Sequence, residues 1–208
     1  MTKGLRWRFI TLMAALVIIL GGASAFLINE GNFVNSTVHD QLAAQQIFFP
    51  DATNAVPGGS LDPAEFPDLQ QYAGQQVDNG EKARVYANDF IAIHLAGVAG
   101  GKTYSEVSAL NSTVAKQLAT TPTTDPNYAT LQAQSATLAG QKTTLFMGEM
   151  LRGTLLNSWG WSTVGTYTAY AAVGLMIAAL GVLGALVFEF FVAGRKPETL
   201  KVAQKIAA

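Results

Sequence analysis

Residues 9–28 read FITLMAALVIILGGASAFLI, a run of twenty positions without a charged side chain. A helix of about twenty residues is roughly 30 Å long, which matches the hydrocarbon thickness of a bilayer. A second uncharged run extends from Gly153 to Phe188, and we expect residues 166–193 to form its membrane part. The two runs predict a membrane protein with two transmembrane helices.

Within the first run, Ala23-Ser24-Ala25 has the small-x-small pattern at which signal peptidases cut. A basic segment precedes it, as in a secretory signal peptide. However, apolar residues continue past Ala25, and the run exceeds the roughly 7–15 residues of a signal-peptide core. We therefore expect a retained membrane helix, with cleavage after Ala25 as the alternative.

Charge divides the chain into three parts. Residues 1–8 and 194–208 each carry a net charge of +3, whereas residues 29–165 hold twelve acidic and six basic side chains. Because basic residues stay in the cytoplasm, this pattern predicts a cytoplasmic N-tail (1–8), an extracytoplasmic region (29–165) and a cytoplasmic C-tail (194–208). We expect interfacial anchors at the membrane surfaces, namely Trp7, Trp159, Trp161, Arg195 and Lys196.

Small residues recur four positions apart in both spans. Such residues let helices approach closely inside a bilayer, where the hydrophobic effect does not drive helices together. We therefore expect helix packing, between the spans or with a larger complex, at Gly21, Ala25, Gly174, Ala178, Gly181 and Ala185.

Glu189 lies near the end of the second span. An acid there suggests either a proton path or a paired carboxylate at the interface, and nearby Arg195 and Lys196 favour the second.

The extracytoplasmic region is expected to be helical around an irregular arm, residues 47–68, which contains four prolines. The first helix should continue past Glu30 towards Gln46. Further helices should cover residues 80–98 and 103–119, the latter opened by a Thr103–Glu106 capping box, and Asp125-Pro126 should start the next one. The arm is either a surface loop or a segment that lies on another subunit through Phe48, Phe49 and Phe66.

The fold class is therefore an all-α membrane protein, with two transmembrane helices flanking an extracytoplasmic helical bundle with a proline-rich arm.

The chain has no cysteine and only two histidines, His39 and His94. Gly-Gly-Lys-Thr at residues 100–103 lacks the spacing of a phosphate-binding loop. We expect no catalytic residue, metal or cofactor; an enzyme would need an acid pair such as Asp89 and Glu106.

Two stretches carry a resemblance to a known family. They are KARVYANDFIAIHLAGVAGGKTYSEVSALNSTV, residues 82–114, and GEMLRGTLLNSWGWSTVG, residues 148–165. They resemble the prokaryotic respiratory supercomplex association factor of actinobacteria, an accessory subunit of the mycobacterial cytochrome bcc–aa3 assembly. The resemblance implies a plasma-membrane subunit without a redox cofactor. Its partners would be cytochrome bcc and aa3 oxidase subunits and the lipid bilayer, with no nucleic acid.

A non-catalytic association subunit is thus the favoured function. A sensor or ligand-binding receptor is the alternative, because two spans around an extracytoplasmic helical region are a common receptor layout. A transducer needs a cytoplasmic output, and residues 194–208 are too short to be one, so a receptor would depend on a separate partner.

Overall fold

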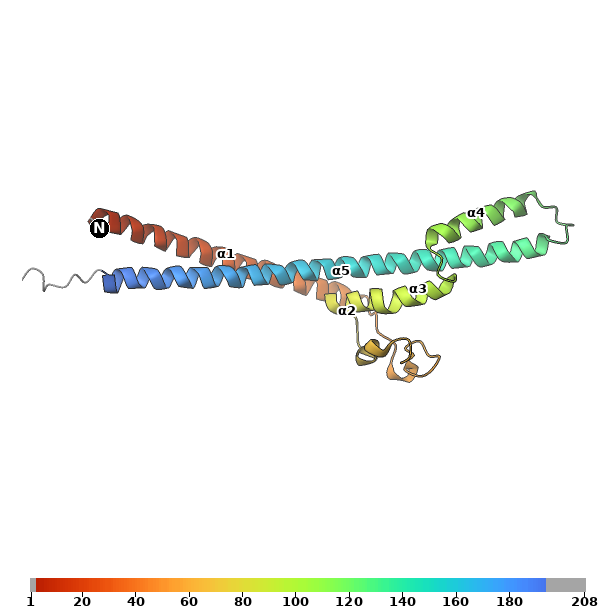
Figure 1. Ribbon diagram of the computed structural model, residues 1–208, viewed down its shortest axis with the longest axis horizontal. Helices are drawn as coiled ribbons and strands as arrows, with labels where there is room; N and C mark the ends of the chain where they lie inside the picture. The colour runs from red at the N-terminus through yellow and green to blue at the C-terminus, as the bar shows by residue number, and fades with distance from the viewer. Residues whose placement is uncertain (1–2, 194–208) are drawn as a thin grey trace, which may run out of the picture. The chain divides into compact units, whose positions relative to one another are not determined.

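The computed structural model describes residues 3–193, and this part of the chain is helical with no sheet. Two long apolar helices dominate it, α1 (Lys3–Ala44) and α5 (Tyr128–Phe188) (Figure 1). The segments Gly4–Ala44 and Tyr128–Phe191 are long and apolar enough to cross a membrane. The all-α class is confirmed. Arg195 and Lys196 lie outside the described residues.

The chain divides into two compact units, and α1 and α5 each contribute to both. The span unit comprises residues 1–34 and 164–208, and the central unit comprises residues 35–163.

In the span unit, an uncharged apolar sequence favours helix because a helix satisfies every backbone hydrogen bond internally. The described part ends in a π-helical turn, η4 (Glu189–Ala193). The two helices approach closely at Gly31. A Cβ atom there would lie 3.1 Å from the Gly165 carbonyl oxygen, so glycine allows the backbones to meet.

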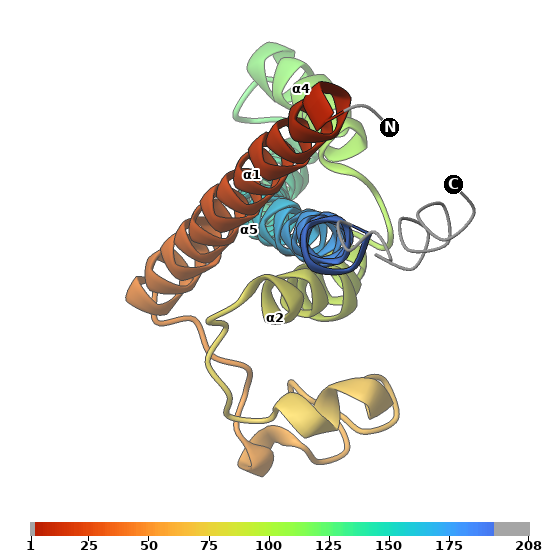
Figure 2. The ribbon, with the colours of Figure 1, turned by 90° about the vertical axis from the view of Figure 1, so that its left-hand side faces the viewer.

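In the central unit, α1 ends at Ala44, where Gln46 turns the chain with a φ of 52°. The Gln76 amide caps the helix by donating to the Ala43 carbonyl at 2.7 Å. The arm that follows holds two short 3₁₀ helices, η1 (Ala52–Asn54) and η2 (Pro67–Tyr72). An antiparallel bridge between Phe48 and Gln76 joins the start of the arm to the segment that follows η2. The irregular segment expected at 47–68 is confirmed, and it lies beside α2 (Figure 2).

The helix expected over residues 80–98 is present as three consecutive segments. These are α2 (Gly80–Val85), η3 (Tyr86–Ile91) and α3 (Ala92–Val98), and the middle one is π-helical, which the sequence pattern did not predict. A turn at Gly100 and Gly101, with φ of 62° and 78°, then leads into α4 (Tyr104–Thr120). The capping box is confirmed: the Glu106 carboxylate accepts from the Thr103 N–H at 2.8 Å, and the Thr103 hydroxyl accepts from the Glu106 N–H.

The start of α5 differs from the prediction. Asp125 is not its N-cap. The Asp125 carboxylate instead accepts from the Asn127 N–H at 2.8 Å, forming a turn, and the helix begins at Tyr128. From there α5 continues without a break past residue 166, so no change in backbone structure marks the expected start of the second span.

The core of the central unit joins α1, the arm, α2, η3, α3, α4 and α5. Its most enclosed side chains come from all parts of the unit, and they include Leu42, Phe49, Leu61, Val77, Val107 and Leu155. In α4, Val107 and Val114 are buried in the described structure, whereas Leu110 is exposed.

Candidate functional site

Ser24 forms the buried polar contact between the two helices of the span unit. Its side chain is 0 % exposed, and its hydroxyl donates to the Ala172 carbonyl of α5 at 2.8 Å. Such hydroxyl-to-backbone bonds hold helices together where water is absent. Ser24 is also the middle residue of Ala23-Ser24-Ala25, so the segment considered as a cleavage site lies within α1 and contacts α5.

The six small residues expected to pack helices do not join the two spans to each other. Ala25, Gly174, Ala178, Gly181 and Ala185 are exposed, and a Cβ atom added at Gly21, Gly174 or Gly181 would touch nothing within 4 Å. The spans meet instead at Ser24, Gly31, Ala172 and Ala179, all buried. Packing of the six residues against a larger complex stays a prediction.

At the other end of the span unit, Arg6 binds both the side chain and the backbone of Glu189. Its Nε donates to the carboxylate at 3.0 Å, and its Nη2 donates to the Glu189 carbonyl at 2.7 Å. The paired-carboxylate interpretation of Glu189 is therefore confirmed, and the partner that the described residues provide is Arg6, 183 residues away. The sequence feature that could have predicted this pair is that both charged residues, one basic and one acidic, are expected at the same membrane surface.

The tryptophans expected at the interfaces are all exposed. Trp7 packs edge-on against Phe190, with ring centroids 6.5 Å apart, while Trp159 and Trp161 are exposed on α5. Exposure suits an interfacial anchor, whose role stays a prediction.

Two of the three arm phenylalanines belong to the core of the chain. Phe49 and Phe66 are 1 % and 3 % exposed; Phe49 stacks on Tyr72, and Phe66 stacks on His94 at 5.2 Å. Neither is free to anchor the arm on another subunit, which corrects that prediction. Phe48 is 52 % exposed and remains a candidate contact. Successive side chains of an extended segment point to opposite sides, which separates Phe48 from Phe49.

Arg152 has a second role besides the ion pair that its spacing predicts. Its Nη1 binds both oxygens of Glu149, at 2.9 and 2.8 Å, which confirms the pair. Its Nε also donates to the Ala87 carbonyl at 3.0 Å, in the π-helical segment η3. Arg152 therefore ties α5 to the stretch where the helix is irregular.

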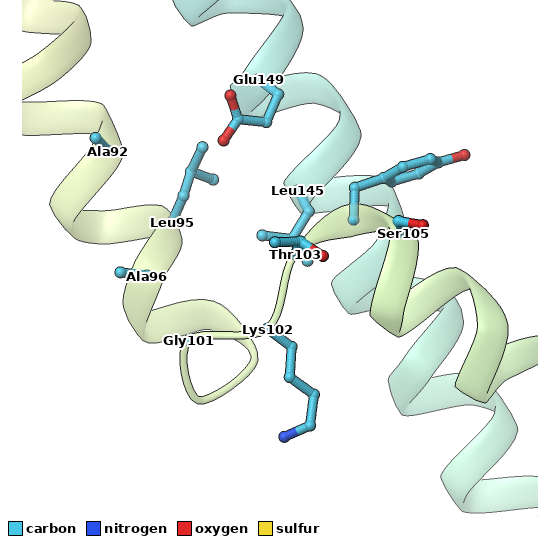
Figure 3. Close-up of a pocket in the computed structure, with 10 residues that line it drawn as sticks. Ala92, Leu95, Ala96, Gly101, Lys102, Thr103, Ser105, Leu145 and Glu149 are labelled. Atoms are coloured by element: carbon cyan, nitrogen blue, oxygen red, sulfur yellow. The ribbon is translucent and has the colours of Figure 1, made fainter.

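A hollow of about 480 Å³ opens beside the turn between α3 and α4 (Figure 3). Its polar groups are largely engaged: Glu149 binds Arg152, and Thr103 belongs to the capping box. Lys102 points away from the hollow in Figure 3. The backbone N–H of Thr103, and then its hydroxyl, hold the pKa of Glu106 below its usual value. The Gly-Gly-Lys-Thr sequence thus builds a helix cap here.

No group of three or more histidine, aspartate or glutamate side chains in the described part of the chain is placed to hold a metal ion. Comparison of the chain with protein-family models, with curated proteins and with solved structures finds no match. Exposed apolar side chains of the described residues lie on the two spans, on the arm at Phe48 and on α5, and these are the candidate contact surfaces.

Proposed function

We propose that the chain is a non-catalytic association subunit of a cytochrome bcc–aa3 supercomplex in the plasma membrane. One observation carries the proposal. In the central unit, α5 exposes a cluster of large apolar side chains, Phe146, Met147 and Met150, and Tyr104 contacts its edge at 5.8 Å from Phe146. We call these four residues the α5 patch.

The α5 patch supports a lasting protein partner. Contiguous exposed apolar surface is uncommon on a free-standing domain and marks interaction sites. Methionine and aromatic side chains are enriched at such interfaces. In the span unit, the exposed small residues Gly174 and Ala178 offer a further surface that a partner helix can approach closely.

The resemblance of residues 82–114 and 148–165 to the actinobacterial association factor selects the partner. The second of these stretches includes Met150 of the α5 patch. Partners would therefore be subunits of the bcc and aa3 complexes, with residues 29–165 on the extracytoplasmic side.

The test is to purify the tagged full-length chain from its native membranes in mild detergent and to record an absorption spectrum. We expect bands of haems a, b and c in the eluate. An eluate without these haems would contradict the proposal, and co-purification of a kinase or transporter instead would support a receptor.

A variant locates the contact. Met150→Glu places a charge in the α5 patch and should lower the co-purified haem severalfold. Gln134→Glu adds the same charge to another exposed position of α5 and should leave the haem content unchanged. Equal haem content in both variants would remove the α5 patch from the interface.

A further inference from the structure

A wholly apolar hollow lies between α1 and α5 in the span unit. Its volume is about 420 Å³, and it is lined by Phe9, Leu12, Met13, Leu16, Gly181, Val182 and Ala185. Two polar contacts bound it along the helices: Arg6 with Glu189 on one side and Ser24 with Ala172 on the other. The helices are thus held together at both ends of a gap that neither fills.

The size and the apolar lining of the hollow indicate what kind of group can occupy it. An apolar gap does not hold water, and in a bilayer an unfilled gap loses the dispersion contacts of its lining. A helix is about 10–12 Å in diameter, too wide to enter a gap between two helices that are joined at both of its ends. A single acyl chain is narrow enough to enter it.

The basic residues near the hollow indicate the charge of the lipid headgroup. Residues 1–8 contain three basic side chains and no acid. Arg6 is engaged with Glu189, whereas Arg8 is exposed and directly precedes Phe9 at the edge of the hollow. Basic residues beside a membrane attract anionic lipids.

We propose that an anionic phospholipid binds the span unit, with one acyl chain in the hollow and its phosphate against Arg8. This inference rests on the membrane insertion included in the proposed function, but not on the supercomplex. Alkaline carbonate washing of membranes checks the insertion separately, because an inserted chain stays in the pellet.

Native mass spectrometry of the full-length chain in mild detergent tests the binding, with phosphatidylglycerol and phosphatidylcholine of identical acyl chains as probes. We expect phosphatidylglycerol to bind about fivefold more tightly, the contribution of one basic residue near the surface. Arg8→Gln should remove this preference. Equal binding of the two lipids by the unaltered chain would overturn the headgroup assignment and the proposal.

Gly181→Leu fills the hollow, and its side chain has room to do so. It should weaken both lipids on the order of tenfold, since displacing even two buried methylene groups has that effect. Gly184→Leu, at an exposed glycine of α5 outside the hollow, is the matched control and should change neither. Equal lipid binding in the two variants would overturn the proposal.

A second measurement does not depend on how these variants fold. A photoactivatable leucine analogue at Leu12 should cross-link in native membranes to phosphatidylglycerol or another anionic lipid. The same analogue at Ile18, which is exposed but does not line the hollow, should capture lipids in their membrane proportions. Cross-linking of position 12 to a polypeptide, or to lipids without anionic enrichment, would overturn the proposal.

Discussion

At the scale of single residues, Ser24 and Ala25 are neighbours in the sequence but differ completely in burial. Neighbouring residues of a helix point about 100° apart. Ser24 is fully buried and bonded to Ala172, whereas Ala25 is exposed. The spacing of Gly21 and Ala25 predicts a helix face able to pack closely against a partner. It does not say which face meets α5, because that depends on the angle at which the helices cross.

The Ser24 contact predicts a ranked pair of variants. Ser24→Ala removes the bond to the Ala172 carbonyl and should lower the free energy of unfolding by about 0.6 kcal/mol, the mean for such bonds in membrane proteins. Ser24→Leu should lower it further, because a larger side chain cannot enter a fully buried position without separating the helices. Thermal unfolding in mild detergent measures both.

The control for this pair is Ala25→Leu. It adds the same bulk one position along the helix on an exposed face, so the unfolding midpoint should stay close to that of the unaltered chain. A larger loss from Ala25→Leu than from Ser24→Leu would mean that α1 presents a different face to α5.

At the scale of elements, the cap of α4 gives a pH dependence with a defined sign. Hydrogen bonds from Thr103 lower the pKa of Glu106 in the folded chain. The stabilisation is therefore fully present above the ordinary glutamate pKa of 4.5, and is lost as pH falls through the lower pKa of the folded chain. Amide exchange in the first turn of α4, corrected for intrinsic rates, should rise as pH decreases through this window.

Glu106→Gln separates this carboxylate from the other acids of the chain. Its amide oxygen still accepts from the Thr103 N–H, but the side chain does not titrate. Exchange in the first turn of α4 should then lose the part of its pH dependence that the cap causes. Identical pH profiles for the variant and the unaltered chain would show that the cap is not responsible.

The arm is held as an element by a row of aromatic rings. Phe66 packs against both Phe90 and His94, at centroid distances of 5.7 and 5.2 Å. Phe66→Ala should weaken this docking by about 3 kcal/mol, as expected for a truncated buried phenylalanine. Limited proteolysis should then cleave within residues 47–68 much faster.

Phe48→Ala is the matched variant for the arm. Because Phe48 is half exposed, its truncation should change stability by no more than about 0.5 kcal/mol and leave the cleavage rate nearly unchanged. Equal cleavage rates in the two variants would contradict docking through Phe66.

The elements of the fold were predictable wherever a local signal exists. Prolines mark the arm, and Thr103 with Glu106 marks the start of α4, because turn and cap chemistry act within a few residues. The π-helical η3 was not predicted, and its contact with Arg152, which donates to the Ala87 carbonyl, joins residues 65 positions apart. The burial of Phe49 and Phe66 was not predicted either. Apolar residues in an arm indicate that it packs on another surface, but they do not indicate which surface that is.

At the scale of the whole molecule, the contacts within the span unit fix the direction of its two helices. Arg6 near the start of α1 meets Glu189 beyond the end of α5, and Gly31 meets Gly165 about 25 residues away along each helix. The two helices therefore run antiparallel, and in the proposed membrane insertion their described ends at residues 3 and 193 face the same surface. The basic residues at both ends favour the cytoplasmic surface.

The absence of cysteine from the sequence makes this topology testable with single introduced thiols. Ser112→Cys, at an exposed position of α4, should react with a membrane-impermeant maleimide in intact cells. Ala203→Cys, in the basic tail, should react only after lysis, because the membrane shields the cytoplasm from the reagent. The unaltered chain is the background control. Labelling of Ala203→Cys in intact cells, with Ser112→Cys protected until lysis, would invert the orientation. It would also place the Arg6–Glu189 pair at the outer surface.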